Sequence, residues 1–408
     1  MAHSVDEAFA PAWLDDNFFR TVIRKFTHDE ATQLCHGCKL RPGTASGEHF
    51  ASVMYRTTIH YRSGKGKEAA LDVIMKIKPF REGLKKDVLN DGDLFVREMR
   101  VYSQVLPEMG RRLKEIGETI NHPRLIYASE VPHTILILED VSGKGWQTGQ
   151  YITSLEEVIP AIKTIAKFHA ASVVLQQDNP SFSIEYQCSV MEKLRALDGM
   201  LRKSFVDLLA FMRSTDGFEQ LVAPVEKLQG TLLDGLIQSY APSTSCMNVL
   251  VHGDFHSKNL LHQITTAGSQ QICDTMLIDY QICSWTTPAV DLFYLLDTIV
   301  DQALKERYRD ELIYVYHEEF ASLLRRLGYL GHITTLLELQ MELLQKGALE
   351  LFHYVALYPF RFVDRSTVDY EQLLSGAAQN PAASSPVYKR VMRTVLTRFL
   401  HQGVMETA

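Results

Sequence analysis

The sequence predicts an α+β protein made of a strand-rich first part and a helical second part. Between about Phe50 and Val141, short segments rich in β-branched and aromatic residues are bounded by turn-forming residues, which is typical of strands. After Gly149, apolar residues recur mainly at helical spacing. We therefore expect two domains, residues 1–141 and residues 142–408.

The first domain is expected to run in the order strand, strand, helix, strand. Residues 50–62 are rich in β-branched and aromatic residues, and residues 69–79 and 132–141 contain short apolar runs. Residues 94–106 place their apolar side chains at helical spacing instead. This domain should therefore be a small sheet whose chain is interrupted by one helix.

The second domain begins with a helix signal and is interrupted once. Ser154 is followed three residues later by Glu157, which is a capping-box pattern, and Pro160 should either kink this helix or mark a later start. The interruption at 248–283 holds two short apolar runs, NVLVHGD and TMLIDYQ, which predict an embedded hairpin. Further helices are expected at 191–214, 217–240, 301–328, 333–360 and 387–402.

The composition is that of a folded protein with no evident affinity for nucleic acid. The 408 residues include 42 Lys and Arg against 49 Asp and Glu, a formal net charge of −7, and 46% of them are hydrophobic. So apolar a chain can bury enough surface to offset its conformational entropy, which excludes wholesale disorder. An acidic chain without a basic tail is not expected to bind nucleic acid, because phosphate contacts need clustered Lys and Arg.

The cysteines and the apolar segments favour a cytoplasmic protein. Six cysteines are too few and too scattered for a disulfide framework, and Cys35 and Cys38 lack a second such pair to complete a zinc site. The acidic N-terminus lacks the apolar run of a signal peptide, and no stretch approaches the ~18 apolar residues that span a bilayer. We therefore expect reduced thiols, no membrane partner and a cytoplasmic location.

The interruption at 248–283 carries the residues with the clearest chemistry. Asp254 is followed five residues later by Asn259, and Asp279 follows the second apolar run. In phosphoryl transfer, the first Asp of such a set accepts the proton of the substrate hydroxyl, while the Asn and the second Asp hold Mg²⁺ beside the nucleotide phosphates. A lone Asp is usually a turn or cap residue, but three matching positions in this order predict a phosphotransferase.

The first domain supplies candidate residues for binding the nucleotide. Lys76 lies inside an apolar strand, where a charge is costly unless it is paired, and Glu98 on the following helix is its expected partner. The alternative is that Lys76 points to solvent from a half-exposed strand. Two further candidates lie at a glycine-containing turn that lacks the full GxGxxG pattern. Two more lie at the end of the third strand, where an adenine-binding hinge is expected. They are Ser46, Gly47, Glu139 and Val141.

The motifs together make the sequence similar to a known family. In order along residues 43–328 they are SGEHFASVMYR, VIMKIKP, FVREMRVY, ILILEDV, AKFHAAS, HGDFHSKNL and LIDYQ. They resemble the ecdysteroid kinase-like family, whose relatives include choline kinase and the aminoglycoside phosphotransferases. The resemblance implies a bilobal protein-kinase-like fold, with a nucleotide-binding first lobe and a helical second lobe that holds the substrate pocket. It also implies dependence on ATP and Mg²⁺.

The resemblance implies a role for each matching residue. Asp254 is the implied catalytic base, and Asn259 and Asp279 are the implied metal ligands. Lys76 and Glu98 are the implied phosphate-positioning pair. These roles agree with those that the spacing of the residues suggests on its own.

The sequence departs from the family pattern at three positions. The family usually has Asn, Trp and Phe where this chain has His49, His256 and Tyr280. None of these changes removes a group that phosphoryl transfer needs. The two histidines are expected to alter how the nucleotide or the substrate is held.

The sequence favours a small-molecule substrate over a protein. Eleven residues separate Asp279 from Asp291, and no DFG or APE motif follows, so a peptide-binding segment has no room. The resemblance implies phosphorylation of a hydroxyl on a largely apolar alcohol, with an ecdysteroid or a foreign compound as the leading candidate. The alternative is a choline-like or aminoglycoside-like cation, whose pocket should gather carboxylates; Glu342 and Glu350 are nevertheless expected on a solvated helix face. A third hypothesis is a nucleotide-binding scaffold that catalyses no phosphoryl transfer.

Overall fold

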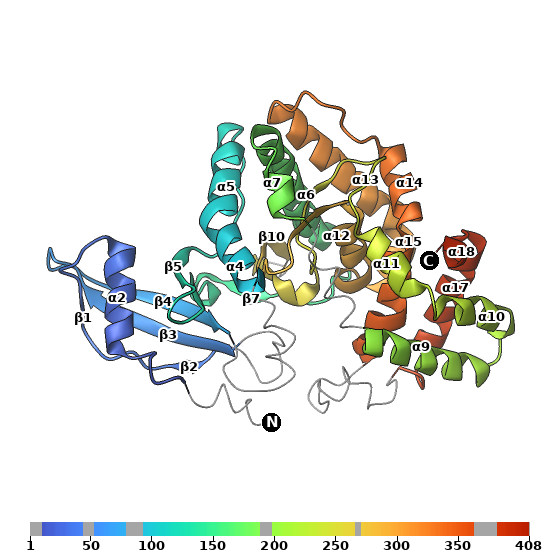
Figure 1. The fold of residues 1–408 in the computed structure, drawn as a ribbon, viewed down its shortest axis with the longest axis horizontal. Helices are drawn as coiled ribbons and strands as arrows, with labels where there is room; N and C mark the ends of the chain where they lie inside the picture. Colours follow the sequence, from blue (N-terminus) through green and yellow to red (C-terminus); the bar gives the residue numbers. More distant parts are fainter. Residues whose placement is uncertain are drawn as a thin grey trace. The chain divides into compact units, whose positions relative to one another are not determined.

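The chain divides into two compact units. The computed structural model describes residues 10–43, 53–78, 93–187, 198–265, 271–362 and 382–407 (Figure 1). Unit 1 comprises Met1–Glu108, Asn121–Gln147 and Ile278–Gln281, and unit 2 comprises Met109–Ile120, Thr148–Leu277 and Ile282–Ala408. Strands prevail in unit 1 and helices in unit 2, which confirms the α+β class. The predicted domain boundary between residues 141 and 142 stays a prediction.

An antiparallel sheet forms the centre of unit 1. Its strands lie in the order β1-β3-β4-β6-β5, with β2 paired to β3. The three predicted strands are confirmed as β3 (Val53–Arg62), β4 (Glu68–Ile77) and β6 (Ile135–Glu139). The sequence did not predict the short strands β1 (Gln33–Leu34), β2 (Arg41–Pro42) and β5 (Leu125–Ser129).

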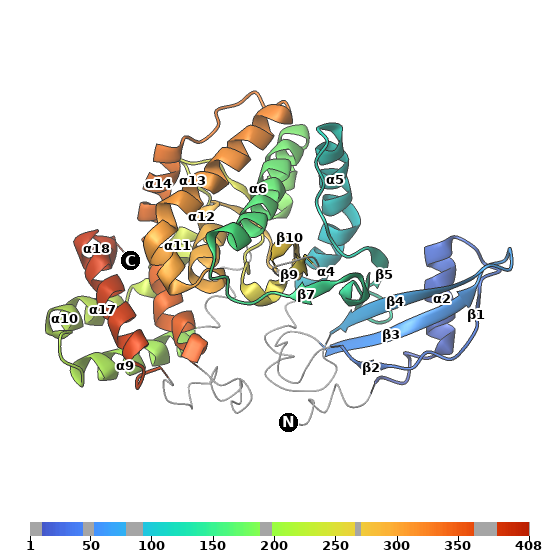
Figure 2. The ribbon, with the colours of Figure 1, turned by 180° about the vertical axis from the view of Figure 1, so that it is seen from behind.

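A helix that the sequence did not predict, α2 (Asp16–Thr27), covers one face of this sheet (Figure 2). Val22 of the helix packs into one core with Val73 and Met75 of β4. Because side chains alternate between the two faces of a strand, Lys76 lies on the face opposite to these two residues. The covered face is therefore structural, and the other face carries the lysine of interest.

The predicted helix at 94–106 consists of three helical segments in succession. They are α4 (Asp93–Arg100), the π-helical turn η1 (Val101–Val105) and α5 (Leu106–Glu115). Glu98 in α4 is 1% exposed. Such wide turns often occur near functional sites, and this one directly follows the helix that carries Glu98.

Unit 2 is built around the long helix α6 (Leu155–Asp178). The Ser154 hydroxyl accepts a hydrogen bond from the Glu157 N–H at 3.3 Å, which confirms the predicted start, and Pro160 lies inside the helix. Contrary to the expectation from the sequence, this helix is long and apolar enough to cross a membrane, alone among the described residues. However, 78% of its most apolar window is buried inside the protein, as is usual for a core helix.

Two predicted helices of unit 2 are each broken. The helix expected at 217–240 is divided into α10 (Glu219–Leu228) and α11 (Leu232–Ser239), with Gly230 between them, and the helix expected at 333–360 begins as α14 (Leu336–Gln345) and α15 (Gly347–Phe352). Glycine favours such breaks because it costs more entropy in a helix than other residues. The other helical segments that the structure describes in this unit are α7 (Phe182–Glu185), α9 (Asp198–Arg213), η3 (Ser257–Asn259), α12 (Ala289–Tyr294), η4 (Leu295–Ile299), α13 (Gln302–Arg326), η5 (His353–Leu357), η6 (Tyr358–Phe362), α17 (Pro386–His401) and α18 (Val404–Thr407).

The two apolar runs near residues 248–283 form strands, but not the predicted hairpin with each other. β8 (Val249–Val251) pairs with β11 (Ser284–Thr286), and β10 (Ile272–Leu277) pairs with β9 (Leu260–Ile264). The prediction was wrong because the two partner strands are short and were not recognised. The loop that contains Asp254 therefore lies between β8 and β9, which belong to two different sheets.

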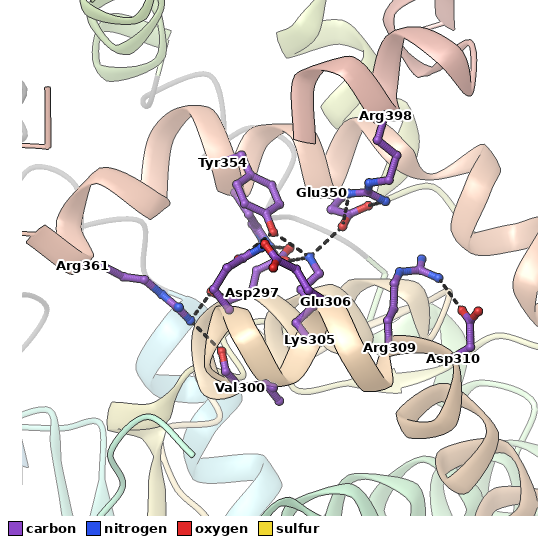
Figure 3. A network of polar contacts seen from close by, with 12 residues as sticks. Asp297, Val300, Lys305, Glu306, Arg309, Asp310, Glu350, Tyr354, Arg361 and Arg398 are labelled. Atoms are coloured by element: carbon purple, nitrogen blue, oxygen red, sulfur yellow. Dashed lines mark hydrogen bonds and ion pairs between the residues drawn. The ribbon is translucent and has the colours of Figure 1, made fainter. Parts of the chain in front are cut away.

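A buried network of charged groups joins several helices of unit 2 (Figure 3). Lys305 of α13 donates hydrogen bonds to Asp297 of η4 and to Glu350 of α15, the latter at 2.7 Å. Arg398 of α17 donates to both carboxylate oxygens of Glu350, at 2.8 and 3.1 Å. The Glu350 side chain is 3% exposed, so the expectation of a solvated helix face is wrong. Because η4 follows α12 directly, the network holds the helix that carries Asp291.

Candidate active site

Lys76 lies in a buried cluster with two carboxylates of unit 1. Its Nζ is 2.7 Å from Glu98 Oε2 and 2.8 Å from Asp279 Oδ1. The side chains of Lys76 and Glu98 are 7% and 2% exposed, whereas that of Asp279 is 23% exposed. The alternative in which Lys76 points to solvent is therefore excluded, and three predicted site residues from three separate chain segments come together.

The electrostatics of this cluster depend on the balance between burial and pairing. Burial raises the pKa of Glu98 to about 7, because the cation of Lys76 offsets only part of the effect of burial. Burial alone would lower the pKa of Lys76, but Asp279 and Glu98 outweigh burial and raise it. The lysine is thus held as a cation, and its partly exposed neighbour Asp279 is the carboxylate that can meet a ligand.

The backbone at Asp279 is strained. Its φ of 68° lies in the left-handed region, which residues other than glycine seldom adopt. The next residue, Tyr280, is fully buried and packs edge-on against Tyr102 of η1, with ring centroids 5.3 Å apart. A strained residue persists only where its surroundings fix it, and such residues cluster at functional sites. Tyr280 therefore anchors the turn that presents Asp279.

In unit 2, Asp291 braces the loop that leads to Asp254. Its carboxylate accepts hydrogen bonds from the backbone N–H groups of His252 at 2.6 Å and Gly253 at 2.9 Å. The His169 Nε2 lies 3.0 Å from the same carboxylate, and its Nδ1 lies 2.7 Å from the Tyr316 hydroxyl. Asp291 and His169 are fully buried, so both position the loop and neither meets a ligand.

The position before Asp254 admits only glycine. Gly253 has a φ of 83°, and a Cβ atom there would lie 2.6 Å from the carbonyl oxygen of Ile282. Both conditions exclude an L side chain without backbone movement.

The Oδ2 atom of Asp254 lies close to two side chains of the same loop. Its Oδ2 accepts a hydrogen bond from Asn259 Nδ2 at 3.0 Å and lies 3.4 Å from His256 Nε2. His256 Nδ1 accepts the Lys258 N–H, which fixes Nε2 as the proton-bearing nitrogen of the neutral ring. Burial raises the pKa of Asp254, but its histidine neighbours and Asn259 outweigh burial and lower it to about 2. An ionised carboxylate in this loop suits a general base.

The comparisons with known proteins agree with these motifs. The sequence profile of the ecdysteroid kinase-like family matches residues 46–329, more than two thirds of the chain. This chain belongs to the ecdysteroid kinase-like family. Its members are small-molecule phosphotransferases, so the chain is a small-molecule kinase that uses ATP.

Solved structures also resemble the chain. One is the crystal structure of an aminoglycoside phosphotransferase from Alicyclobacillus acidocaldarius subsp. acidocaldarius DSM 446, with a TM-score of 0.38 and 16% sequence identity. The alignment covers 84% of this chain and 90% of that chain. No curated protein matches the sequence.

The residues of this ecdysteroid kinase-like chain fit the Mg²⁺–ATP that its family implies. Asn259 Nδ2 donates to the backbone oxygen and to Oδ2 of Asp254, so its carbonyl oxygen is the atom left to meet a cation. Asp279 uses Oδ1 for Lys76, which leaves Oδ2. Mg²⁺ prefers such oxygen donors and keeps several waters. Within the described ranges, no cluster of three or more His, Cys, Asp or Glu side chains offers an alternative metal site.

The predicted adenine-binding residues lie at the end of β6 and just after it. The Glu139 side chain pairs with Lys144 at 2.7 Å, and its backbone N–H donates to the Arg124 carbonyl. Val141 is 7% exposed, and its carbonyl accepts the Lys144 N–H at 2.9 Å. Their role in adenine binding stays a prediction. The candidates Ser46 and Gly47, and the departure at His49, lie outside the described residues.

Two carboxylates that were assigned to solvated helix faces are buried instead. Glu342 is 1% exposed and accepts hydrogen bonds from the hydroxyls of Ser243 at 2.8 Å and Ser245 at 3.2 Å. Glu350 is bound by Lys305 and Arg398, as described above. A sequence shows that a helix carries an acid but not that another helix covers it. The predictions for these two residues therefore failed for lack of tertiary information.

Sequence reasoning also missed the hydrogen-bonding role of His256. Replacing His256 by Phe should reduce kcat about tenfold, because Asp254 Oδ2 loses a donor whose bond is worth about 1.5 kcal/mol. The KM for ATP should change little. His256→Trp restores the usual family residue, whose indole N–H can also donate, and should retain most activity. Steady-state kinetics test this expectation, and an unchanged kcat for His256→Phe would contradict it.

Proposed function

We propose that this chain is an ATP- and Mg²⁺-dependent O-phosphotransferase that acts on a small, largely apolar alcohol. An ecdysteroid or a foreign compound is the leading candidate, and the cytoplasm is the proposed location. The observation that carries the proposal is the buried cluster in which Lys76 meets both Glu98 and Asp279. A lysine held as a cation beside one exposed carboxylate suits the binding of a nucleotide phosphate and its metal ion.

In this proposal each residue has one task. Asp254 accepts the proton of the substrate hydroxyl at Oδ1, because Oδ2 is held by Asn259 and His256. Asn259 and Asp279 hold Mg²⁺ through oxygen atoms, and Lys76 holds phosphate oxygens. ATP supplies the phosphoryl group, and Mg²⁺ neutralises the charge of the phosphates. The new bond joins the alcohol oxygen to phosphorus, and ADP leaves with the electrons of the broken bond.

The burial of Glu342 and Glu350 favours an apolar alcohol over a cationic one. A pocket for a choline-like or aminoglycoside-like cation needs carboxylates that can face the ligand. Both oxygens of Glu350 are bound by cationic side chains, and Glu342 is buried against two serines. Neither of the two carboxylates considered for such a pocket is therefore exposed to a ligand.

A substrate panel tests this proposal. The protein is incubated with Mg²⁺–ATP and either a polyhydroxylated steroid such as an ecdysteroid, apolar monohydroxy alcohols, choline, or an aminoglycoside, and phosphate esters are measured by mass spectrometry. Esters of the steroid or of the apolar alcohols support the proposal. Esters of the cationic alcohols alone would establish the alternative, and nucleotide binding without any ester would indicate a silent scaffold.

Replacing Asp279 by Asn should weaken the binding of Mg²⁺–ATP by at least about tenfold. The substitution removes the one carboxylate of the cluster that is partly exposed, which is one of the two that pair with Lys76. Calorimetric titration with ATP, with and without Mg²⁺, measures the effect. Asp72→Asn, which changes an exposed carboxylate in the same unit, is the control. Equal Kd values for Mg²⁺–ATP in wild type and Asp279→Asn would contradict the assigned role.

A further inference from the structure

Unit 1 contains a groove of about 1010 Å³ that the proposed reaction does not use. The C-terminal end of α2 lines it with Lys25, Phe26 and His28, and α4 and η1 line it from Val96 to Gln104. Every residue from Leu125 to Val131 also lines it, which includes the whole of β5. Figures 1 and 2 both show β5 between α2 and α4.

The groove follows an open edge of the sheet. β5 is the last strand in the order β1-β3-β4-β6-β5, and β6 is its strand partner within the described part of unit 1. An edge strand presents alternate N–H and C=O groups on its outer side, and an extended peptide can pair with them. At ~3.3 Å per residue, the seven lining residues from Leu125 to Val131 can accompany a segment of about six residues.

The charges along the groove select an acidic occupant. Lys25 of α2 and Arg100 at the end of α4 are exposed cations on the two helical walls, and His28 lies beside the first. Glu130 is the acidic side chain of the lining, at the far end of the strand segment. Next to it, Val131 is 82% exposed, which offers an apolar contact. Proteins usually protect a sheet edge of this kind with a cover or with charge.

We propose that this groove binds an extended acidic segment of a partner protein, which adds to β5 as a further strand. The carboxylates of the segment meet Lys25 and Arg100, and its apolar side chains contact Met99 and Val131. Because specificity in strand addition comes from alternate side chains, acidic and apolar residues should alternate in the bound segment.

The groove and the Lys76 cluster share one helix. Val96, Met99 and Arg100 line the groove, whereas Glu98 on the same helix bonds Lys76 at 2.7 Å. A bound segment therefore contacts the helix that holds the lysine partner. This link to nucleotide binding rests on the proposed function, but binding to the groove does not.

Peptide binding by the full-length protein tests the proposal without any nucleotide. The probe is a fluorescein-labelled hexapeptide, Val-Glu-Val-Glu-Val-Glu, and the comparison peptides replace Glu by Lys or carry N-methyl groups on alternate amides. Fluorescence anisotropy should show binding of the acidic peptide that is at least about tenfold weaker after N-methylation and at least about tenfold weaker in a Lys25→Glu/Arg100→Glu variant. A Lys65→Glu/Lys67→Glu variant has the same change in charge at an exposed turn and should bind like wild type.

Hydrogen exchange locates the bound peptide. The proposal predicts slower exchange of backbone amides within 125–131 when the acidic peptide is bound. Equal binding of the lysine peptide, unchanged binding by the Lys25→Glu/Arg100→Glu variant, or protection confined to other segments would overturn it. So would a lack of peptide binding together with self-association that the same variant abolishes, because the groove would then belong to a second copy of the chain.

Discussion

Replacing Asp254 by Asn is expected to reduce kcat by about 10²–10⁴-fold while the binding of Mg²⁺–ATP is retained. The amide can still accept the hydrogen bonds that Asn259 and His256 make to Oδ2, so the loop should keep its conformation. It cannot accept the proton of the substrate hydroxyl, and a positioned general base contributes about 10²–10⁴-fold to rate. Steady-state kinetics and nucleotide titration separate the two effects.

The control for this variant is Asp310→Asn, which changes a carboxylate that is 85% exposed on α13. It should leave kcat unchanged. The lowered pKa of Asp254 adds a pH expectation: the ionised base is fully present above its ordinary pKa of 3.8 and is lost only as the pH falls toward about 2. Asp254 should therefore cause no loss of kcat between pH 5 and 8. An Asp254→Asn variant as active as wild type would remove the proposed base from the mechanism.

Replacing Lys305 by Met is expected to lower the free energy of unfolding by about 3–5 kcal/mol. The Lys305 side chain is 5% exposed and pairs with Asp297 and Glu350, which are each 3% exposed (Figure 3). Without the lysine, buried Asp297 keeps the His353 ring, whose Nδ1 lies 3.0 Å from Oδ2, and Glu350 keeps Arg398, so both carboxylates lose their shared cation. Removing one partner of a buried ion pair costs far more than the pair itself contributes. Chemical denaturation measures the change.

A matched surface pair provides the contrast. Arg390 and Glu306 lie 3.4 Å apart, with side chains that are 58% and 37% exposed, so Arg390→Ala should cost less than about 1 kcal/mol. Equal decreases in the free energy of unfolding for Lys305→Met and Arg390→Ala would show that the buried network stabilises the fold no more than a surface ion pair does. Lys305 and Arg398 also outweigh burial and lower the pKa of Glu350. The ionised Glu350 carboxylate therefore stabilises the folded protein at pH values above its ordinary pKa of 4.5, and this stabilisation is lost as the pH falls below 4.5.

Long strands and continuous apolar runs could be predicted from the sequence, whereas several short strands without such a run could not. β3 and β4 each have ten residues with a sustained pattern, and both were predicted. β5 and β11 have five and three residues and were missed, whereas β6 and β8 are equally short but were recognised from their continuous apolar runs. The helix α2 was missed as well, although the core that it covers includes strand residues that were correctly assigned.

The candidate site was predictable where its residues carry chemistry in a fixed order. Asp254, Asn259 and Asp279 follow apolar runs, and the charge of Lys76 inside a strand implied a buried partner. The sequence could not reveal which oxygen of Asp254 is engaged, because that depends on the orientation of His256. Glu342 and Glu350 were assigned to the surface because the sequence does not show which helices cover them. Spacing along the chain predicts what a residue can do, but packing decides what reaches it.

Phosphotransferase activity is tested by following the γ-phosphate of ATP to an alcohol. The protein is incubated with Mg²⁺, γ-labelled ATP and a mixed extract of small alcohols, and the labelled products are identified by mass spectrometry. We expect a labelled phosphate ester of an apolar alcohol, and this product should be absent when Asp254→Asn replaces the wild type. Label that remains in ATP, or that passes only into inorganic phosphate, would contradict it.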